Sequence, residues 1–441
     1  MIAEEGAAAP IRVRSRLFGM SPRLRNLLIL VVIAALSGLG QTLFRDVIAL
    51  LRQSRHLLNE DLGVATRASF IAYIVMLPAG GFLAHLFGPR QVLLPAGVLI
   101  AVAGSGMGFV FDARSYAGLC LLLGLAAGTV PGAAVTAIGF LFAPQEHARA
   151  IGCLHAAPVL GSFAVTLAIS DRAQHLSAWG IEEYWRALVL VFGLLAVVWT
   201  YQAYKWYGAR PVPAGSAWAD RWSTDLPVGT LWPLGVVLRG GVLLLFAYVQ
   251  VYGLGLGGAW LVERLFATWH LDIDFSGFVG LCGLAGGMTG SLAGGFLSDA
   301  AFLQSGNVKS ARQVVIGVGF LLGACCLLPL RHTHDVFHAG LWRGLSFFCF
   351  SLPGAPLWSI ALTIAPGKPG PVVGMLGLGS ALGLLISPAI LAGYLGGIGW
   401  MFCFWLGVAF AFVCGVAAFF LDPALEIEKP LPKPPPDGED G

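Results

Sequence analysis

The chain contains the stretch GGFLAH at residues 80–85 and its near-copy GGFLSD at residues 294–299. The offset between the two copies is 299 − 85 = 214 residues, close to half of the 441-residue chain. Each copy ends a long apolar run, at residues 66–86 and 275–298. Both runs are long enough to cross a bilayer as a helix, which needs about 20 mostly apolar residues. This repetition predicts a duplicated, membrane-embedded domain.

A second pair of matching stretches supports the duplication. Ala-Pro at residues 143–144 precedes Gly152 by the same spacing with which Ala-Pro at residues 365–366 precedes Gly374. Here the offset is 374 − 152 = 222 residues, similar to that of the first pair. Parallel repeats with a binding site at their interface are one known plan of membrane transporters. We therefore expect two similar bundles of helices.

The composition places the chain in lipid. Hydrophobic residues make up 57% of the sequence, charged residues only 11%, and the mean hydropathy is +0.80. A soluble protein of this size would contain about 25% charged residues. The net charge of +3 is too small to indicate a nucleic-acid partner. The lipid bilayer is therefore the expected surrounding of most of the chain.

Twelve apolar runs have the length of a membrane span. They cover residues 27–51, 66–86, 91–111, 116–142, 150–170, 186–206, 237–262, 275–298, 313–330, 339–364, 372–396 and 398–421. An even number of spans places both termini on the same side. Arginines are frequent before residue 27, so the positive-inside rule predicts that both termini are cytoplasmic and that the protein is a multi-pass protein of the inner membrane.

The spans divide the chain into five expected regions. The longest internal hydrophilic stretch separates six spans from six, and the proline-rich, acidic end of the chain predicts a disordered tail. The regions are a cytoplasmic N-terminal segment (1–26), an N-terminal six-helix bundle (27–206), a cytoplasmic linker (207–236), a C-terminal six-helix bundle (237–421) and a disordered cytoplasmic tail (422–441).

A family resemblance follows from the segment GFLAHLFGPR at residues 81–90. It resembles the loop between helices two and three of the major facilitator superfamily, with the pattern G-x-L-a-D-r-x-G-r. YWR at residues 184–186 and PQEHAR at residues 144–149 support the resemblance, which covers residues 25–421. It implies an all-α membrane protein with twelve transmembrane helices in two six-helix bundles. In that superfamily the bundles rock and expose a central site alternately to each side of the membrane.

The same resemblance implies a gating loop. Its members in this chain are Gly81, His85, Gly88 and Arg90, with Asp299 at the matching place in the second half. The chain departs from the family pattern because His85 replaces the usual acidic residue, whereas Asp299 keeps it. The resemblance therefore implies that the latch of the first half is weaker or sensitive to pH.

Arg45 and Gln41 are the first candidates for contact with a substrate. They lie four residues apart and share one face of the first span, and a guanidinium group binds carboxylate or phosphate in a fork. The alternative is a structural ion pair of Arg45 with Asp46, or a side chain that extends to the interface. The position of Arg45 is similar to that of the helix-one arginine of organophosphate:phosphate antiporters. Val251 stands where their second arginine would be, which favours a monoanion over a phosphate ester.

Span seven offers three further candidates. Gln250 is a rare residue type at this depth and is expected to face the cavity or a neighbouring helix. Tyr248 and Tyr252 are one helical turn apart and share a face. They are expected either to line or gate the substrate path, or to pack against other helices.

Three ionisable residues have both functional and structural interpretations. Asp46 and His155 are candidates for proton coupling, because a buried carboxylate or imidazole can titrate near neutral pH. Asp46 can instead pair with Arg45, and His155 can bind a carbonyl freed near Pro158. Arg343, at the start of span ten, is expected to be an interfacial anchor.

Several classes of chemistry find no support in the sequence. There is no G-x-x-x-x-G-K-[ST] loop for ATP, no H-E-x-x-H and no nucleophile elbow. The eight cysteines are scattered in apolar stretches without a C-x-x-C pair, so buried free thiols are expected. We therefore expect no cofactor, no metal and no enzyme activity.

The leading functional hypothesis is a secondary active transporter of a small solute that works by alternating access. The solute is expected to be an organic anion such as a monocarboxylate, with transport coupled to protons or to another gradient. One alternative is a carrier of a neutral or drug-like solute. Another is a membrane assembly or sensor protein with a transporter-like fold and no transport, for which His85 is the hint.

Overall fold

The computed structural model describes residues 22–421 except 56–58, 111, 179–183, 207–233, 270–272, 334, 366–368 and 396–398. The described side chains also leave out residues 46–62, 168–184 and 259–276, which belong mostly to helices. The described residues form helices and short turns, with no strand among them. Twelve of these segments are long and apolar enough to cross a membrane, which confirms the predicted number of spans.

The first half of the chain forms six long helices. They are α1 (Pro22–Arg55), α2 (Asn59–Phe87), α3 (Pro89–Met107), α4 (Ala113–Leu141), α5 (His147–Ala178) and α6 (Tyr184–Trp206). A 3-10 turn, η2 (Pro144–Glu146), joins α4 to α5. Very short turns also separate α2 from α3 and α3 from α4. Such short turns force consecutive helices to run antiparallel.

The second half forms six spans from eight helices. They are α8 (Leu234–Trp269), α9 (Ile273–Ser305), α10 (Val308–Leu330), α11 (Val336–Ser351), α12 (Gly354–Ile364), α13 (Pro369–Leu385), α14 (Pro388–Leu395) and α15 (Gly399–Ala418). Two predicted spans are thus interrupted, the tenth between α11 and α12 and the eleventh between α13 and α14. Both interruptions lie at a proline, Pro353 or Pro388, which has no N–H to donate and whose ring crowds the preceding turn.

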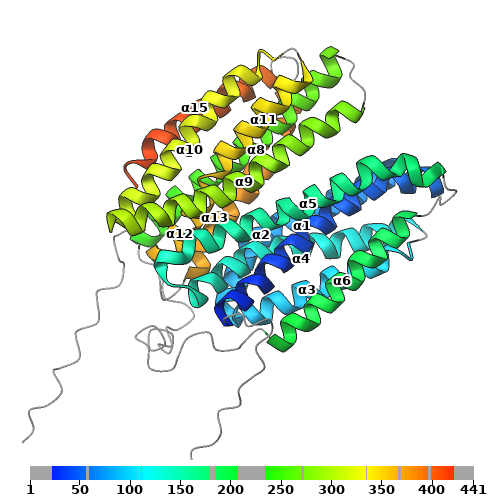
Figure 1. Ribbon diagram of the computed structural model, residues 1–441, viewed down its shortest axis with the longest axis horizontal. Coiled ribbons are helices and arrows are strands. Elements are labelled where there is room, and N and C mark those ends of the chain that lie inside the picture. The colour runs from blue at the N-terminus through cyan, green and yellow to red at the C-terminus, as the bar shows by residue number, and fades with distance from the viewer. Residues whose placement is uncertain are drawn as a thin grey trace, which may run out of the picture.

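The helices gather into two bundles, as Figure 1 shows: α1 to α6 form one and α8 to α15 the other. The bundles meet near α12 and α13 and separate toward the opposite ends of the helices. We call the first region the closed end; it contains the start of α1 at Pro22, the α2–α3 turn at Gly88 and the α9–α10 turn at Gly306. We call the opposite region the open end; it contains the turns between α3 and α4 and between α10 and α11.

Two glycines allow backbone contact between the bundles at the closed end. A Cβ atom on Gly81 of α2 would lie 2.6 Å from the carbonyl oxygen of Gly370 in α13. A Cβ atom on Gly295 of α9 would lie 2.4 Å from the carbonyl oxygen of Ala148 in α5. Both positions belong to the repeated GGFL stretches, so the duplication supplies two equivalent close contacts between α2 and α13 and between α9 and α5.

Candidate substrate site

A cavity of about 500 Å³ lies mainly within the first bundle. Its walls come from α1, α2, α4 and α5, and the second bundle contributes Leu284 of α9 and Leu384 of α13. The lining residues with a polar group are Ser37, Gln41, Thr42, Arg45, Thr66, Ser69, Tyr73, Tyr116, Cys120, His155 and Ser162. Volumes of 300–1,000 Å³ are typical of small-molecule sites. We call this space the polar cavity.

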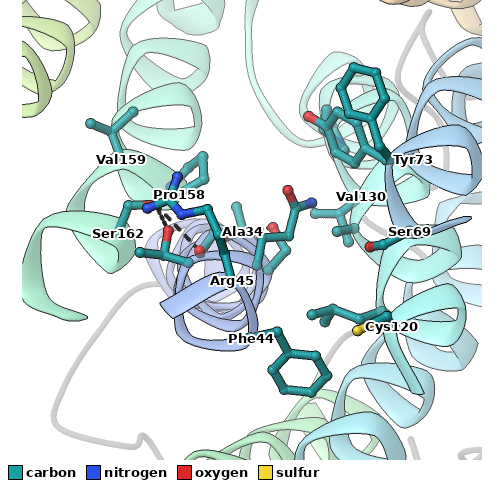
Figure 2. Close-up of a pocket in the computed structure, with 18 of the residues that line it drawn as sticks. Ala34, Phe44, Arg45, Ser69, Tyr73, Cys120, Val130, Pro158, Val159 and Ser162 are labelled. Atoms are coloured by element: carbon teal, nitrogen blue, oxygen red, sulfur yellow. Dashed lines mark hydrogen bonds between the residues drawn. The ribbon is translucent and has the colours of Figure 1, made fainter. Parts of the chain in front are cut away.

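Arg45 and Gln41 both line the polar cavity, at the places where the sequence predicts a substrate contact. Together with Ser37 they form a polar stripe on α1, because residues four apart lie on one helix face. The side chain of Arg45 is exposed. Figure 2 shows Arg45 between Ser162 of α5 on one side and Tyr73 of α2 on the other.

Hydroxyl groups fix α5 against α1 beside Arg45. The Thr42 hydroxyl donates to the Ser162 hydroxyl at 2.8 Å, and Ser162 donates to the carbonyl oxygen of Gly38 at 3.3 Å. On the other side of α1, the buried Tyr116 donates to the carbonyl oxygen of Phe44 at 3.0 Å. These bonds hold the residues on both sides of Arg45, so the backbone that positions its guanidinium is well supported.

The sequence interpretation missed most of these polar lining residues. A usable signal was present, because Ser69 and Tyr73 lie four residues apart in span two and so share a face. Hydroxyl side chains are nevertheless common in membrane helices, where they donate hydrogen bonds to backbone carbonyl oxygens of the same helix. Thr129, for example, donates to the carbonyl oxygen of Leu125 at 2.7 Å. Hydroxyl positions alone therefore do not distinguish a cavity wall from ordinary packing.

His155 lines the polar cavity and also reaches the second bundle. Its ring meets the ring of Trp358 edge to face, with centroids 5.4 Å apart. A Cβ atom on Gly354 would lie 3.4 Å from Nδ1 of His155 and 2.7 Å from Nε2 of Gln250. Two predicted site residues from different bundles therefore approach the same glycine. Gln250 itself donates to the carbonyl oxygen of Phe350 at 3.1 Å.

None of the three candidates of span seven lines the polar cavity. Tyr252 is fully buried and donates to the carbonyl oxygen of Cys403 in α15 at 3.2 Å. Tyr248 packs against Tyr252 and Phe410, with ring centroids 5.9 and 6.2 Å away. This geometry matches the packing alternative for both tyrosines. Asp46 belongs to α1, but its side chain lies outside the described residues.

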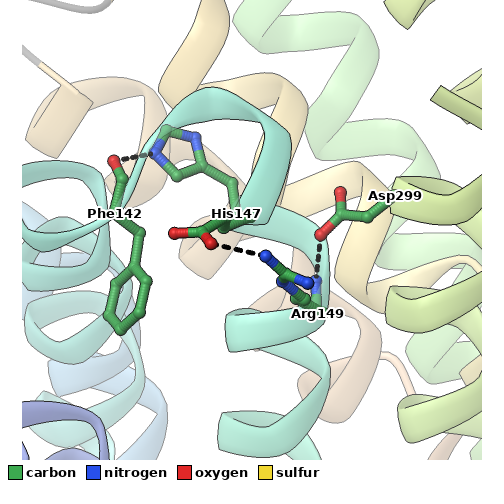
Figure 3. A network of polar contacts seen from close by, with 5 residues as sticks. Phe142, His147, Arg149 and Asp299 are labelled. Carbon is green, nitrogen blue, oxygen red and sulfur yellow. Dashed lines mark hydrogen bonds and ion pairs between the residues drawn. The ribbon is translucent and has the colours of Figure 1, made fainter. Parts of the chain in front are cut away.

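At the closed end, Asp299 links the two bundles. Its carboxylate is 3% exposed and accepts a hydrogen bond of 2.8 Å from the backbone N–H of Arg149, in the first turn of α5 (Figure 3). The Arg149 guanidinium in turn pairs with Glu146 at 2.5 Å. A negative charge at a helix N-terminus is stabilised by the helix dipole. We call this contact between α9 and α5 the Asp299 latch.

Arg312, which the sequence interpretation missed, reinforces the closed end. This residue of α10 is 1% exposed and donates to Ser359 O at 3.1 Å and to the Thr363 hydroxyl at 2.5 Å, both on α12. A third bond of 3.3 Å reaches the carbonyl oxygen of Pro144 in the other bundle. The signal was in the repeat: 312 − 90 = 222, the offset of the second pair of matching stretches, so Arg312 is the counterpart of Arg90.

The remaining residues of the predicted gating loop lie at the α2–α3 turn. Gly88 has φ = 86°, a conformation that suits glycine, and it ends α2. Arg90 donates to the carbonyl oxygen of Tyr204 in α6 at 3.1 Å, so this bond stays within the first bundle. His85 lies against the first turn of α13, where a Cβ atom on Gly370 would be 2.5 Å from the Cβ atom of His85.

The sequence of the chain matches the profile of a known protein family. The profile described as Major Facilitator Superfamily matches residues 30–371, which is most of the chain. The chain belongs to the major facilitator superfamily. This MFS protein is a multi-pass membrane transporter and not an enzyme, and the predicted all-α fold of twelve membrane helices in two bundles is confirmed.

Two known proteins are similar to this MFS transporter, one in sequence and one in fold. It is 25% identical over 394 residues to a protein of Cupriavidus necator described as "Probable sulfoacetate transporter SauU", covering 86% of this chain and 89% of that one. Its fold is similar to that of the MFS proton:xylose symporter XylE bound to 6-bromo-6-deoxy-D-glucose, with a TM-score of 0.68 and 13% identity. That alignment covers 90% of this chain and 95% of the symporter chain.

Proposed function

We propose that this MFS transporter moves a small organic anion and that Arg45 in the polar cavity binds the anionic group. The observation that carries the proposal is the shared face of Arg45 and Gln41, which both line the cavity. Guanidinium forms charge-assisted, two-pronged hydrogen bonds with carboxylate or sulfonate oxygens. The amide of Gln41 and the hydroxyl of Ser69 offer further donors to the same ligand.

The similarity to a probable sulfoacetate transporter supports an anion over a neutral solute. Sulfoacetate presents a carboxylate and a sulfonate, both of which suit a guanidinium partner. Among the described residues of the second bundle, Leu284 and Leu384 reach the cavity. A small solute would therefore bind first to the polar groups of the first bundle.

We infer that the structure represents an outward-open state of an alternating-access cycle. The arginine-rich N-terminal segment favours a cytoplasmic N-terminus in the inner membrane, and α1 begins at the closed end. The Asp299 latch and the bond from Arg312 to Pro144 join the bundles at that end. Both would have to break when the bundles rock and open the cavity to the cytoplasm.

We propose His155 as the proton-coupling group among the described residues. Its imidazole lines the polar cavity and touches Trp358 of the second bundle, so its protonation would change both the cavity charge and a contact between the bundles. His155→Asn keeps a similar polar shape without the titratable ring. We expect this variant to retain anion exchange but to lose acceleration of uptake by an inwardly directed proton gradient.

Transport in proteoliposomes tests the proposal. Uptake of labelled sulfoacetate and of labelled acetate would be measured for wild type, Arg45→Gln and Arg67→Gln. Arg67 lies on α2 and is exposed, but it does not line the cavity, so it is the matched control for loss of a positive charge. We expect Arg45→Gln to lower kcat/KM by about tenfold or more, as loss of a hydrogen-bonded charge pair implies.

The same assay separates the alternatives. Uptake that is unchanged in Arg45→Gln, or uptake of labelled xylose in preference to both anions, would show that Arg45 is not the anion site. A preference for xylose would also favour a neutral solute.

A further inference from the structure

A second arginine lies half-buried in the other bundle, outside the residues that line the polar cavity. The sequence predicts Arg343 of α11 to be an interfacial anchor, but the structure places its side chain between α8, α9 and α11. Its Cζ atom lies 5.1 Å from the ring centroid of Phe347, and its Nε atom is buried without a hydrogen-bond partner. The guanidinium therefore lies among three helices of the second bundle.

Glycines create the space that holds this guanidinium. A Cβ atom on Gly283 of α9 would lie 2.6 Å from Nε of Arg343, and one on Gly258 of α8 would lie 3.5 Å from Nη2. One turn along α11, Ser346 is fully buried and its hydroxyl also has no hydrogen-bond partner. That hydroxyl would lie 3.3 Å from a Cβ atom on Gly257. Two neighbouring polar groups thus lie against glycines of α8 and α9.

The energetic cost of a guanidinium at position 343 suggests that it has a function. Burial of an ion in a membrane protein is costly, and such ions are by default functional candidates. Among the described residues, no carboxylate forms an ion pair with Arg343, and its guanidinium lies over the ring of Phe347. The side chain of Glu263, on α8, lies outside the described residues. A Glu263→Gln variant therefore tests whether this residue pairs with Arg343.

Arg343 and Arg45 lie at similar distances along the chain from the helix ends at the closed end. Arg45 is 45 − 22 = 23 residues from the start of α1 at the closed end, which is about 34 Å at 1.5 Å per residue. Arg343 is 364 − 343 = 21 residues from the end of α12 at the closed end, which is about 32 Å. Gly283, which the guanidinium touches, directly precedes Leu284 in the wall of the polar cavity.

We propose that Arg343 and Ser346 form a second anion subsite and that the transported solute has two acidic groups. Arg45 holds one acidic group in the open state. Arg343 takes the other when the second bundle closes over the cavity, so that the solute links the two bundles. This inference rests on the proposed function, because it assigns the second group of a solute whose first group is bound by Arg45.

The test compares a solute with two acidic groups with solutes that have one. Uptake of labelled sulfoacetate, acetate and methanesulfonate would be measured in proteoliposomes for wild type, Arg343→Gln and Arg331→Gln. Arg331 lies over the ring of Trp405 at the open end and controls for loss of an arginine there. We expect Arg343→Gln to lower kcat/KM for sulfoacetate by about tenfold. Uptake of acetate and methanesulfonate should change by less than about twofold.

A second variant distinguishes loss of the subsite from misfolding. Gly283→Ala keeps the arginine but places a methyl group 2.6 Å from its Nε atom, too close for contact, so it should also reduce the preference for sulfoacetate. Equal losses for all three solutes in both variants, or no loss in either, would overturn the subsite. An equal loss of selectivity in Glu263→Gln would instead assign Arg343 to a structural ion pair. Failure of the proposed function is distinct, since Arg45→Gln would then leave the uptake of every anion unchanged.

Discussion

Arg45 shows how far a single residue can be interpreted from sequence. A charge within an apolar run is costly in lipid, so its presence predicts a role, and Gln41 on the same face predicts a cavity wall. The structure places both residues on that wall, together with His155. Tyr248 and Tyr252 carried no comparable signal, because an apolar helix that is surrounded by lipid and protein has no periodicity that distinguishes its faces.

Arg312 leads to a prediction about stability. Its guanidinium is buried and donates to three acceptors, so Arg312→Met would remove all three bonds, including the one to the carbonyl oxygen of Pro144 in the other bundle. We expect a loss of about 3 kcal/mol, because removal of one partner of a buried charged network is costly. The melting temperature in detergent should fall by roughly 5–10 °C.

Arg90 is the matched control for that substitution. It is the repeat-related arginine, but it is half-buried and donates to one carbonyl oxygen, that of Tyr204. Arg90→Met should therefore lower the melting temperature by less than about 3 °C. Equal effects of the two substitutions would contradict the assignment of Arg312 to the closed end.

The helices were predictable because lipid imposes a length and a composition on each span. The interruptions at Pro353 and Pro388 could not be predicted in the same way. Pro78 and Pro131 also lie in the middle of spans, yet α2 and α4 continue through them. A proline removes one hydrogen bond in either case, and neighbouring helices decide whether the segment bends or breaks.

The N-terminus of α4 leads to a prediction about pH. Asp112 accepts hydrogen bonds from the Ser115 hydroxyl and N–H, and chiefly the hydroxyl bond lowers the pKa of this carboxyl. The folded state therefore favours the carboxylate. The stabilisation is present above the ordinary carboxyl pKa and is lost as the pH falls through the lowered value.

Melting temperatures of wild type and Asp112→Ala, measured from neutral pH to about pH 3, would check this. The difference between the two proteins should be largest near neutral pH and should shrink on acidification. A difference that is constant over the whole range would show that the charge of Asp112 does not contribute to the cap.

At the scale of the whole molecule, the sequence predicts two bundles but not which end is closed. The repeats relate the bundles to each other, whereas the choice of end depends on a small free-energy difference between two arrangements of the same helices. The Asp299 latch contributes to that difference by placing a carboxylate at the start of α5. His85 occupies the repeat-related place at α13 without a carboxylate.

This asymmetry predicts opposite effects of two substitutions. Asp299→Asn removes the charge that favours the closed end, and we expect the population open at that end to rise about fivefold. His85→Asp adds a carboxylate at the first turn of α13 and should lower that population and slow turnover. Distances between spin labels at the exposed Phe87 and Leu303, one in each bundle, would report both changes. Shifts in the same direction would contradict the symmetric role of the two positions.

The central claim is that the polar cavity binds an organic anion through Arg45, and direct binding tests it most closely. Equilibrium binding of labelled sulfoacetate to purified wild type, Arg45→Gln and Arg67→Gln would be measured in detergent. We predict saturable binding by wild type and Arg67→Gln, and a Kd at least about tenfold higher for Arg45→Gln. Equal affinity of the Arg45→Gln protein would contradict the claim.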